Sequence, residues 1–261
     1  MKTILLQSHK PPPWPRWIER CVDSAAAWAR RRSIPSLFLN DELFEDLPPE
    51  FLRLTAGDVL PRTDIGRLLW MRRLHDEGWE RVIWLDADVL VFDDRLAFDG
   101  DAVGKEAWVT GGGAGAPCVT RKVNNCVLCF DAGSAHLARY LDACLARAAS
   151  LTGPPGRMAF GPDLMTELHL TRSFPLHPDV AMFSPRVLEA LAAGGGPALD
   201  AHQSAWGGAP MAANLCASLS DNEEVIDVAV DRLLSTRGAA SRNDGAFTEL
   251  PLGPGRPLVW A

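Results

Sequence analysis

The chain has 261 residues, 47% of them hydrophobic and 23% charged, so it can bury one large core without disulfides or a structural metal. Its net charge of −7 excludes the basic face of a nucleic-acid-binding domain, but not a nucleotide ligand, because a bound cation can reverse the local field. No apolar run reaches the roughly 20 residues of a membrane span, and the N-terminal one is too short for a signal peptide. We therefore expect a cytoplasmic protein, at most in peripheral contact with the inner face of a membrane.

The beginning of the chain predicts a strand, a helix and a second strand. An apolar strand covers Thr3 to Ser8, a helix with hydrophobic residues near a 3.6 period runs from about Trp14 to Arg31, and a strand covers residues 36–39. A nucleotide-binding α/β domain opens in this order, with polar residues at the strand ends. The polar residues at these two ends are Gln7, Ser8 and Asn40.

The middle of the chain predicts a helix followed by a buried strand. The helix begins at Pro61, with Thr63 as N-cap, and stops at Gly78. Residues 81–92 read RVIWLDADVLVF, and such a near-continuous apolar run predicts a strand buried on both faces of a parallel sheet. No repeat or linker divides the chain, so we expect one domain. Further strands are expected over 107–110, 122–130 and 180–183, and further helices over 134–149, 164–170 and 221–235.

Asp86 and Asp88 stand one residue apart inside this apolar run. Burying an unpaired carboxylate is costly, and two neighbouring carboxylates also repel each other. Such a pair needs a cation, a shared proton or exposure at the C-terminal edge of the strand, where ligands of open α/β sheets bind. A hard divalent cation suits two aspartates and usually completes its shell with substrate phosphate oxygens. The simpler alternative is that both residues merely end the strand and cap the next segment of the chain.

The helix before this pair and several later segments follow the order of one known family. Residues 63–92 join a TDIGR helix to the hydrophobic DAD strand, and this stretch resembles the DxD-sugar glycosyltransferases of the family 32 and capsular-polysaccharide type. The resemblance continues to Trp206 through the segments NNCVLCF, GPDLMT, FSP and HQSAW. It implies a GT-A fold, a single Rossmann-like α/β domain with a mixed, mainly parallel central sheet. Residues 1–92 would bind the nucleotide sugar and 93–220 the acceptor, while 221–261 would form a C-terminal helix and an irregular tail.

The resemblance also implies roles for individual residues. Asp86, Asp88 and His202 would bind Mn²⁺ or Mg²⁺, with His202 in a glycine-bounded loop and Asp86 also contacting the ribose. Ser204 and Trp206 would donate hydrogen bonds to the β-phosphate of the nucleotide. The remaining implied residues are Asp64, Arg67 and Asn125 at the donor sugar and phosphate, Gln7, Ser8 and Asn40 around the base, and Asp163 beneath the sugar as an orienting or charge-stabilising group.

These roles predict a retaining transfer of sugar from a UDP- or GDP-sugar to a hydroxyl acceptor, such as a glycan or glycolipid. The cation, the guanidinium and the neutral donors would stabilise the charge that develops on the leaving diphosphate. Two alternatives use the same residues: a phosphatase or nucleotidyl-type enzyme with Asp86 as nucleophile, and a sugar-nucleotide binder without catalysis. The phosphatase pattern normally lies on the first strand and needs a later lysine and paired acids, whereas only Lys105 and Lys122 follow here.

Three other features have both a structural and a functional explanation. Cys126 and Cys129 form a CxxC pair in an apolar segment without a second pair, which predicts buried strand cysteines and neither a zinc site nor a redox pair. Gly66 weakens its helix by up to about 1 kcal/mol and would allow a ligand to approach closely. The glycine-rich residues 111–115 would form either a lid over the site or a plain connector.

Overall fold

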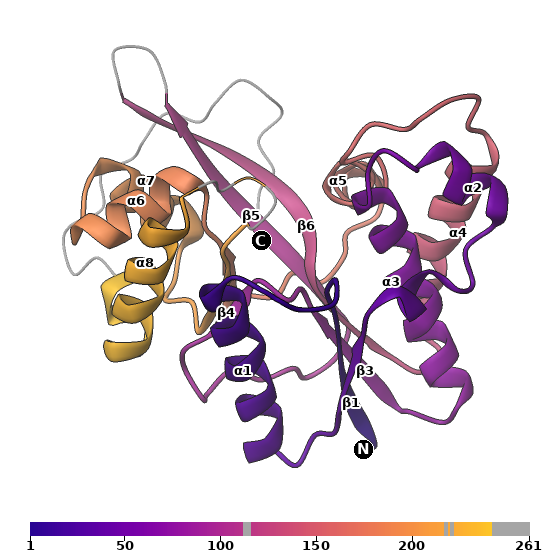
Figure 1. The fold of residues 1–261 in the computed structure, drawn as a ribbon, viewed down its shortest axis with the longest axis horizontal. Helices are drawn as coiled ribbons and strands as arrows, with labels where there is room; N and C mark the ends of the chain where they lie inside the picture. Colours follow the sequence, from indigo (N-terminus) through magenta and orange to yellow (C-terminus); the bar gives the residue numbers. More distant parts are fainter. Residues whose placement is uncertain (112–115, 217–218, 220–221, 242–261) are drawn as a thin grey trace.

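A five-stranded sheet forms the centre of the molecule (Figure 1). The computed structural model describes residues 1–111, 116–216, 219 and 222–241. The strand order is β2-β1-β3-β6-β5, and a second, three-stranded sheet has the order β4-β8-β7. The strands are β1 (Thr3–Ser8), β2 (Ser36–Leu39), β3 (Arg81–Leu85), β4 (Val89–Val91), β5 (Ala102–Gly111), β6 (Pro117–Asp131), β7 (Val180–Met182) and β8 (Ala212–Asn214).

Four strands of the central sheet point in the same direction. β1 pairs in parallel with both β2 and β3, whereas β6 is antiparallel to β3 and to β5. β5 therefore runs in the direction of β1, β2 and β3, and only β6 opposes them. The predicted α/β class and the mixed, mainly parallel sheet are confirmed.

Helices cover both faces of this sheet, because its strands alternate apolar side chains between the faces. Leu6 and Trp84 pack into one core with α3 and α4, while Leu5 and Ile83 pack into another with α1. Figure 1 shows α1 on one side of β1 and β3, and α3 and α4 on the other. The helices are α1 (Arg16–Arg31), η1 (Asp41–Phe44), α2 (Pro49–Leu54), α3 (Leu60–Asp76), α4 (Ala135–Ala149), α5 (Pro162–Thr171), α6 (Pro185–Ala193), α7 (Pro197–Trp206), α8 (Glu223–Ser235) and η4 (Ala239–Ser241).

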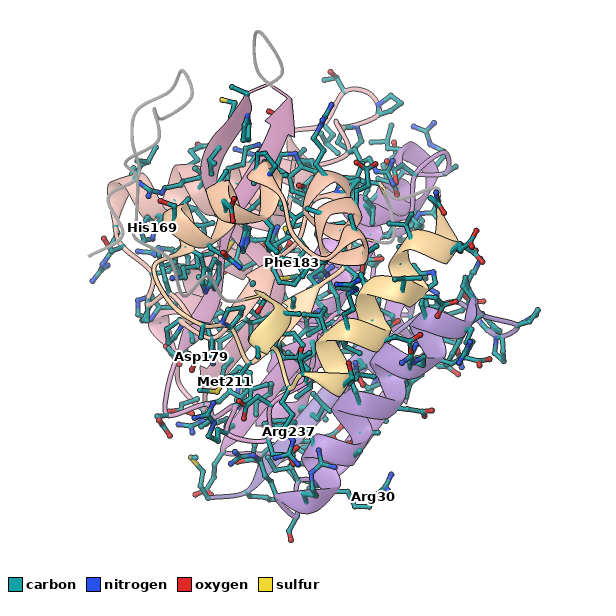
Figure 2. The ribbon with its side chains drawn as sticks, turned by 90° about the vertical axis from the view of Figure 1, so that its left-hand side faces the viewer. Arg30, His169, Asp179, Phe183, Met211 and Arg237 are labelled. Atoms are coloured by element: carbon teal, nitrogen blue, oxygen red, sulfur yellow. The ribbon has the colours of Figure 1, made fainter. Side chains whose placement is uncertain are left out.

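A third core joins the small sheet to the helices of the C-terminal half. Leu90 of β4 and Phe183 pack there with residues of α1, α6, α7 and α8. Figure 2 shows α8 lying beside α1, and Arg20 of α1 bridges to Asp231 of α8 at 2.7 Å. In the described part of the chain, no helix combines the length and the apolar character required to span a bilayer.

The predicted long strand over residues 81–92 is instead two strands in two different sheets. β3 ends at Leu85 and β4 begins at Val89, and the N–H of Val89 donates to the carbonyl of Asp86 across a tight turn at 2.9 Å. All residues of both strands are buried, which explains the unbroken apolar run. Asp86 and Asp88 therefore occupy the turn that takes the chain from one sheet to the other.

Three local predictions are wrong. Helix α3 begins at Leu60 with Val59 as N-cap, so Thr63 lies inside the helix and its hydroxyl donates back to the Val59 carbonyl. A Cβ at Gly66 would lie 2.6 Å from the carbonyl oxygen of Leu43, so the close approach at Gly66 is to η1 and not to a ligand. The His202–Trp206 segment is helical in α7 and not a loop.

Other predictions hold. Gly78 ends α3 with a φ of 91°, and Cys126 and Cys129 are free, buried residues of β6. The sequence did not suggest η1, α2, α6 or β8. Residues 112–115 of the glycine-rich segment lie outside the described residues.

Candidate active site

The site is built around an interruption in the pairing of β6 with β5, next to the residues of β6 that pair with β3. Val103 of β5 pairs with Leu128 of β6, but the next residue, Gly104, pairs with Asn124. Residues 125–127 therefore form a bulge opposite no residue of β5, and such bulges re-aim side chains and backbone groups. A Cβ at Gly104 would lie 2.8 Å from the Asn124 carbonyl oxygen, so the close approach of the two strands at this bulge requires glycine. The bulge brings the Cys126 carbonyl to the N–H of Asp86, at 2.9 Å.

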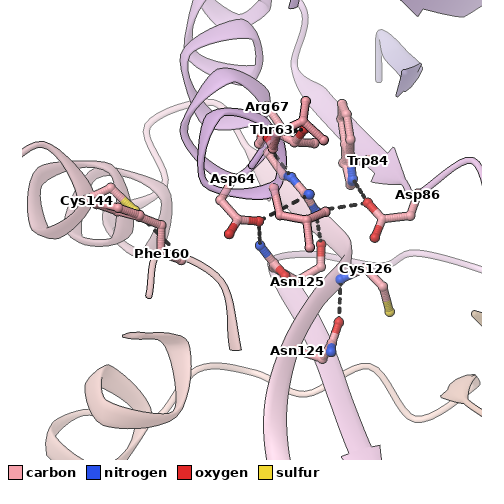
Figure 3. Close-up of polar contacts among 12 residues, drawn as sticks. Thr63, Asp64, Arg67, Trp84, Asp86, Asn124, Asn125, Cys126, Cys144 and Phe160 are labelled. Carbon is pink, nitrogen blue, oxygen red and sulfur yellow. Dashed lines mark hydrogen bonds and ion pairs between the residues drawn. The ribbon is translucent and has the colours of Figure 1, made fainter. Parts of the chain in front are cut away.

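Arg67 is the buried centre of the site (Figure 3). Its Nη1 donates to Asp86 Oδ1 at 2.9 Å and to the Asn125 carbonyl, which the bulge leaves unpaired with β5, at 2.6 Å. Its Nε donates to the Thr63 carbonyl at 3.2 Å, and its Nη2 lies 3.3 Å from Asp64 Oδ1. A guanidinium has five N–H donors; three of them donate to these protein groups, and Nη2 adds the ion pair with Asp64. Arg67 therefore mainly holds the protein's own groups in place.

Asp86 is held through one carboxylate oxygen. Oδ1 accepts from Arg67 and from the indole N–H of Trp84, the latter at 2.6 Å. Oδ2 accepts from none of the described residues, and the side chain remains 25% exposed. Burial raises the pKa of the Asp86 carboxyl, whereas Arg67 and the Trp84 N–H oppose that rise. The arrangement fixes the orientation of the carboxylate and leaves its second oxygen for a ligand.

Asp64 and Asn125 form the inner part of the same network. Asn125 Nδ2 donates to Asp64 Oδ1 at 2.8 Å and to the Tyr140 hydroxyl oxygen at 3.2 Å. Gly161 at the start of α5 adjoins both, since a Cβ there would lie 2.9 Å from Asp64 Oδ2. Burial raises the pKa of Asp64 to about 6, against the opposing effects of Arg67 and Asn125. The structure thus places Asp64 among protein groups, with 5% of its surface exposed.

The raised pKa of Asp64 predicts a specific pH dependence of stability. The folded state keeps a proton on Asp64 that the unfolded state loses, so this group destabilises the fold as pH rises from about 4 through about 6. We expect Asp64→Asn to gain up to about 3 kcal/mol in free energy of unfolding relative to the wild type between pH 4 and pH 7. Urea denaturation in metal-free buffer measures this, with Asp76→Asn on the same helix as control. A stability difference that stays constant over this range would contradict the assignment.

Asp88 is oriented by the end of β8. Asn214 Nδ2 donates to Asp88 Oδ1 at 2.6 Å, and the Asn214 Oδ1 accepts from the N–H of Cys216 at 2.8 Å. The N–H of Leu215 donates to the Asp88 carbonyl at 3.0 Å. The two aspartates of the turn are therefore fixed by different elements, Asp86 by Arg67 of α3 and Trp84 of β3, and Asp88 by Asn214 of β8.

The donor set at this turn suits a hard divalent cation only in part. Mg²⁺ and related ions are commonly held by one or two carboxylates and substrate phosphates, which Asp86 and Asp88 can provide. Over residues 1–111, 116–216, 219 and 222–241, however, no three His, Cys, Asp or Glu side chains form a group that could hold a metal ion. The structure does not assemble the predicted set of Asp86, Asp88 and His202.

His202 lies in the apolar core instead. Its ring stacks on Trp206 at a centroid distance of 5.8 Å and meets the edge of Phe183 at 5.0 Å, with 1% of the residue exposed. Burial lowers the pKa of His202 to about 4, so its imidazole is neutral at pH 7. Its Nε2 has no hydrogen-bond partner among the described residues. The helical conformation of α7, which the sequence pattern did not predict, directs this side chain inward.

The other predicted site residues lie on the surrounding elements. Asp163 begins α5, is half-exposed and pairs with Lys122 Nζ at 3.1 Å. Trp206 is buried on α7 under Lys105, whose Nζ lies 4.0 Å from the centre of its ring, and Ser204 is half-buried on the same helix. Gln7 is buried at the end of β1, whereas Ser8 and Asn40 are half-buried at the ends of β1 and β2.

The structure therefore brings together Asp64, Arg67, Asp86 and Asn125 in direct contact. The sequence predictions did not include Trp84 and Tyr140, which complete this network, or Asn214, which holds Asp88. Trp84 had a detectable signal, because residues two apart along a strand lie on the same face and Asp86 directly follows β3. Asn214 lies in a short strand far along the chain and gave no signal.

Comparisons with known proteins give structural similarities only, at low sequence identity. No family model matches it, and no curated protein matches it in sequence. Among solved structures, it is similar to a glycosyltransferase involved in the glycosylation of the major capsid of PBCV-1, with 10% identity and a TM-score of 0.46. That match covers 88% of this chain and 98% of the glycosyltransferase. It is also similar to mouse xyloside xylosyltransferase 1 in its apo form, with 12% identity and a TM-score of 0.43. That match covers 84% of this chain and 99% of the xylosyltransferase. Likeness at this level assigns no activity to the chain.

Proposed function

We propose that the protein is a retaining glycosyltransferase that moves a sugar from a UDP- or GDP-sugar to a hydroxyl of a glycan or glycolipid. The observation that supports this most is how the two carboxylate oxygens of Asp86 are bonded. One oxygen is saturated by Arg67 and Trp84, and the other is open at the C-terminal end of β3, next to Asp88. Ligands of open α/β sheets bind at this edge. A diphosphate bound there through a cation matches two oriented carboxylates.

The residues around the turn have distinct parts in the proposed reaction. A divalent cation held by Asp86 and Asp88 would neutralise charge on the leaving nucleoside diphosphate. Arg67 acts as a positioning residue for Asp86, because its three hydrogen bonds and its ion pair with Asp64 all go to protein groups. Asp163, half-exposed at the start of α5, is the group proposed beneath the donor sugar. The acceptor hydroxyl attacks from the side of the departing phosphate, which takes its proton, so no protein nucleophile is needed.

The geometry gives the phosphatase alternative less support. A nucleophilic aspartate in that chemistry works beside a lysine, but the partners of Asp86 are Arg67 and Trp84. Of the two lysines that follow in the sequence, Lys122 pairs with Asp163 and Lys105 lies over Trp206. Covalent capture of an aspartyl phosphate would reverse this preference.

The test is release of nucleoside diphosphate from a panel of UDP- and GDP-sugars. We expect slow hydrolysis of at least one donor with Mn²⁺ or Mg²⁺ and none after chelation with EDTA, because the leaving diphosphate then lacks its counter-charge. Activity should return when the metal is restored. Turnover that is unchanged by EDTA, or turnover of phosphate monoesters in place of nucleotide sugars, would contradict the proposal.

A further inference from the structure

Glu106 of β5 is a buried carboxylate that the proposed reaction does not yet use. Only 7% of the residue is exposed, and its Oε2 accepts from Asn124 Nδ2 at 2.8 Å. Its Oε1 accepts a hydrogen bond from none of the described residues. Burial raises the pKa of Glu106, and Asn124 opposes that rise. Among the described residues, the fully enclosed side-chain oxygens that lack a partner do not include Oε1, so this oxygen keeps some exposure and a ligand can reach it.

The orientation of Glu106 is set by the same bulge that builds the site. Asn124 Oδ1 accepts from the N–H of Cys126 at 2.7 Å, which forces the Asn124 NH₂ group to face Glu106. The same NH₂ group contacts the sulfur of Met182 at 2.9 Å. Asn124 therefore fixes one Glu106 oxygen, as Arg67 and Trp84 fix one oxygen of Asp86. In both carboxylates, the second oxygen accepts a hydrogen bond from none of the described residues.

Glu106 lies close to the aspartates of the turn without joining them. Asn124 connects Glu106 to the turn, because its side chain donates to Glu106 and accepts from the N–H of Cys126, whose carbonyl accepts from the N–H of Asp86 at 2.9 Å. Yet no three His, Cys, Asp or Glu side chains in the described residues are close enough together to share a metal ion. Glu106 also pairs across the strands with Lys122 of β6, whose Nζ lies 3.1 Å from Asp163 Oδ1. It thus stands between the proposed diphosphate site and the residue proposed beneath the sugar.

We propose that Glu106 binds the donor sugar by accepting a hydrogen bond from one of its hydroxyls at Oε1. This inference rests on the proposed function, since it takes the sugar to extend from a diphosphate held at Asp86 and Asp88. A hydroxyl is a neutral donor whose hydrogen bond to a carboxylate is stronger than one between neutral groups. The ligand class is therefore a nucleotide sugar whose ring presents a free hydroxyl toward β5.

The experiment compares the affinity of a nucleotide sugar with that of its own nucleoside diphosphate. Kd values for both are measured by calorimetry with Mn²⁺, for the wild type, Glu106→Gln and the exposed control Glu189→Gln. In Glu106→Gln the amide oxygen of the new side chain can still accept from Asn124, but an NH₂ group stands where Oε1 was. We expect Kd for the nucleotide sugar to rise about 10- to 100-fold in Glu106→Gln, with Kd for the nucleoside diphosphate unchanged. Glu189→Gln should change neither value.

The outcomes separate this inference from the proposed function. If no nucleoside diphosphate binds to the wild type, the proposed function fails and the inference fails with it. If it binds and Glu106→Gln weakens both ligands equally or neither, the proposed function stands and the role of Glu106 is overturned. Unchanged binding of the nucleoside diphosphate shows that the variant is folded. Glu106→Asp, which withdraws the carboxylate by one methylene, should weaken the nucleotide sugar selectively as well.

Discussion

Asp88→Asn is expected to lower kcat/KM for donor turnover about 10³-fold, because a charged metal ligand contributes several kcal/mol to stabilising the leaving diphosphate. The fold should persist. An asparagine at this position keeps a carbonyl oxygen that can accept from Asn214, in place of the 2.6 Å bond to Asp88 Oδ1. Its backbone carbonyl still accepts from Leu215. Initial rates of nucleoside diphosphate release over a range of Mn²⁺ concentrations give the measurement.

The matched control is Asp94→Asn. Asp94 lies six residues further along, has 68% of its side chain exposed, and pairs with Arg31 at the surface. Its replacement removes the same charge from the same region of the chain and should leave turnover within a factor of about two, as is usual for surface positions. Undiminished turnover in Asp88→Asn would remove the metal assignment from the turn, whatever the donor proved to be.

Much of the fold could be predicted because local patterns decide it. The strands Thr3–Ser8 and Ser36–Leu39 appear at their predicted bounds, since apolar runs between polar ends have few other solutions in an α/β chain. The helix α4 begins where Ser134 caps it, with the side chain accepting from the N–H groups of His136 and Leu137. These elements depend on residues close together in sequence.

The break between β3 and β4 could not be predicted in the same way. The run RVIWLDADVLVF is apolar on both sides of the turn, because each short strand is buried in its own sheet. The switch depends on β8, which pairs with β4 from more than 120 residues away and supplies Asn214 to Asp88. Hydrophobicity reports burial and does not report which strand is the partner.

The residues of the site likewise divide into those that local sequence patterns predict and those that depend on distant strand pairing. Asp64, Arg67 and Asp86 come from two adjacent elements, and their contact follows once helix α3 packs beside β3. Glu106 and Asn124 depend on a bulge in the pairing of β5 with β6, which leaves no trace in hydrophobic periodicity. His202 was misplaced because a glycine-bounded segment suggested a loop, whereas Gly196 and Gly207 flank a short helix.

Arg67→Met is expected to lower the free energy of unfolding by about 3–5 kcal/mol at pH 8. The substitution leaves the buried Asp64 and the partly exposed Asp86 close together without the Arg67 guanidinium, and the Asn125 carbonyl without its donor. At pH 5 the loss should be smaller, because Asp64, with a pKa of about 6 in the wild type, is then mostly protonated. Urea denaturation at the two pH values measures both effects. Arg72→Met, an exposed position on the same helix, should change stability by no more than about 0.5 kcal/mol.

A double substitution shows whether charge is the cause. In the Arg67→Met background, Asp64→Asn removes one of the two uncompensated carboxylates and should recover part of the lost stability at pH 8. Arg67→Lys keeps the positive charge and tests whether the shape of the guanidinium matters. One ammonium cannot reach Asp86, Asn125 and Thr63 as the planar guanidinium does. Arg67→Lys should therefore fold better than Arg67→Met and yet turn over donor poorly, since Asp86 loses its fixed orientation. If Arg67→Met were no less stable than Arg72→Met, Arg67 would not hold these carboxylates, and a direct contact with the donor would become the better explanation for its place in the site.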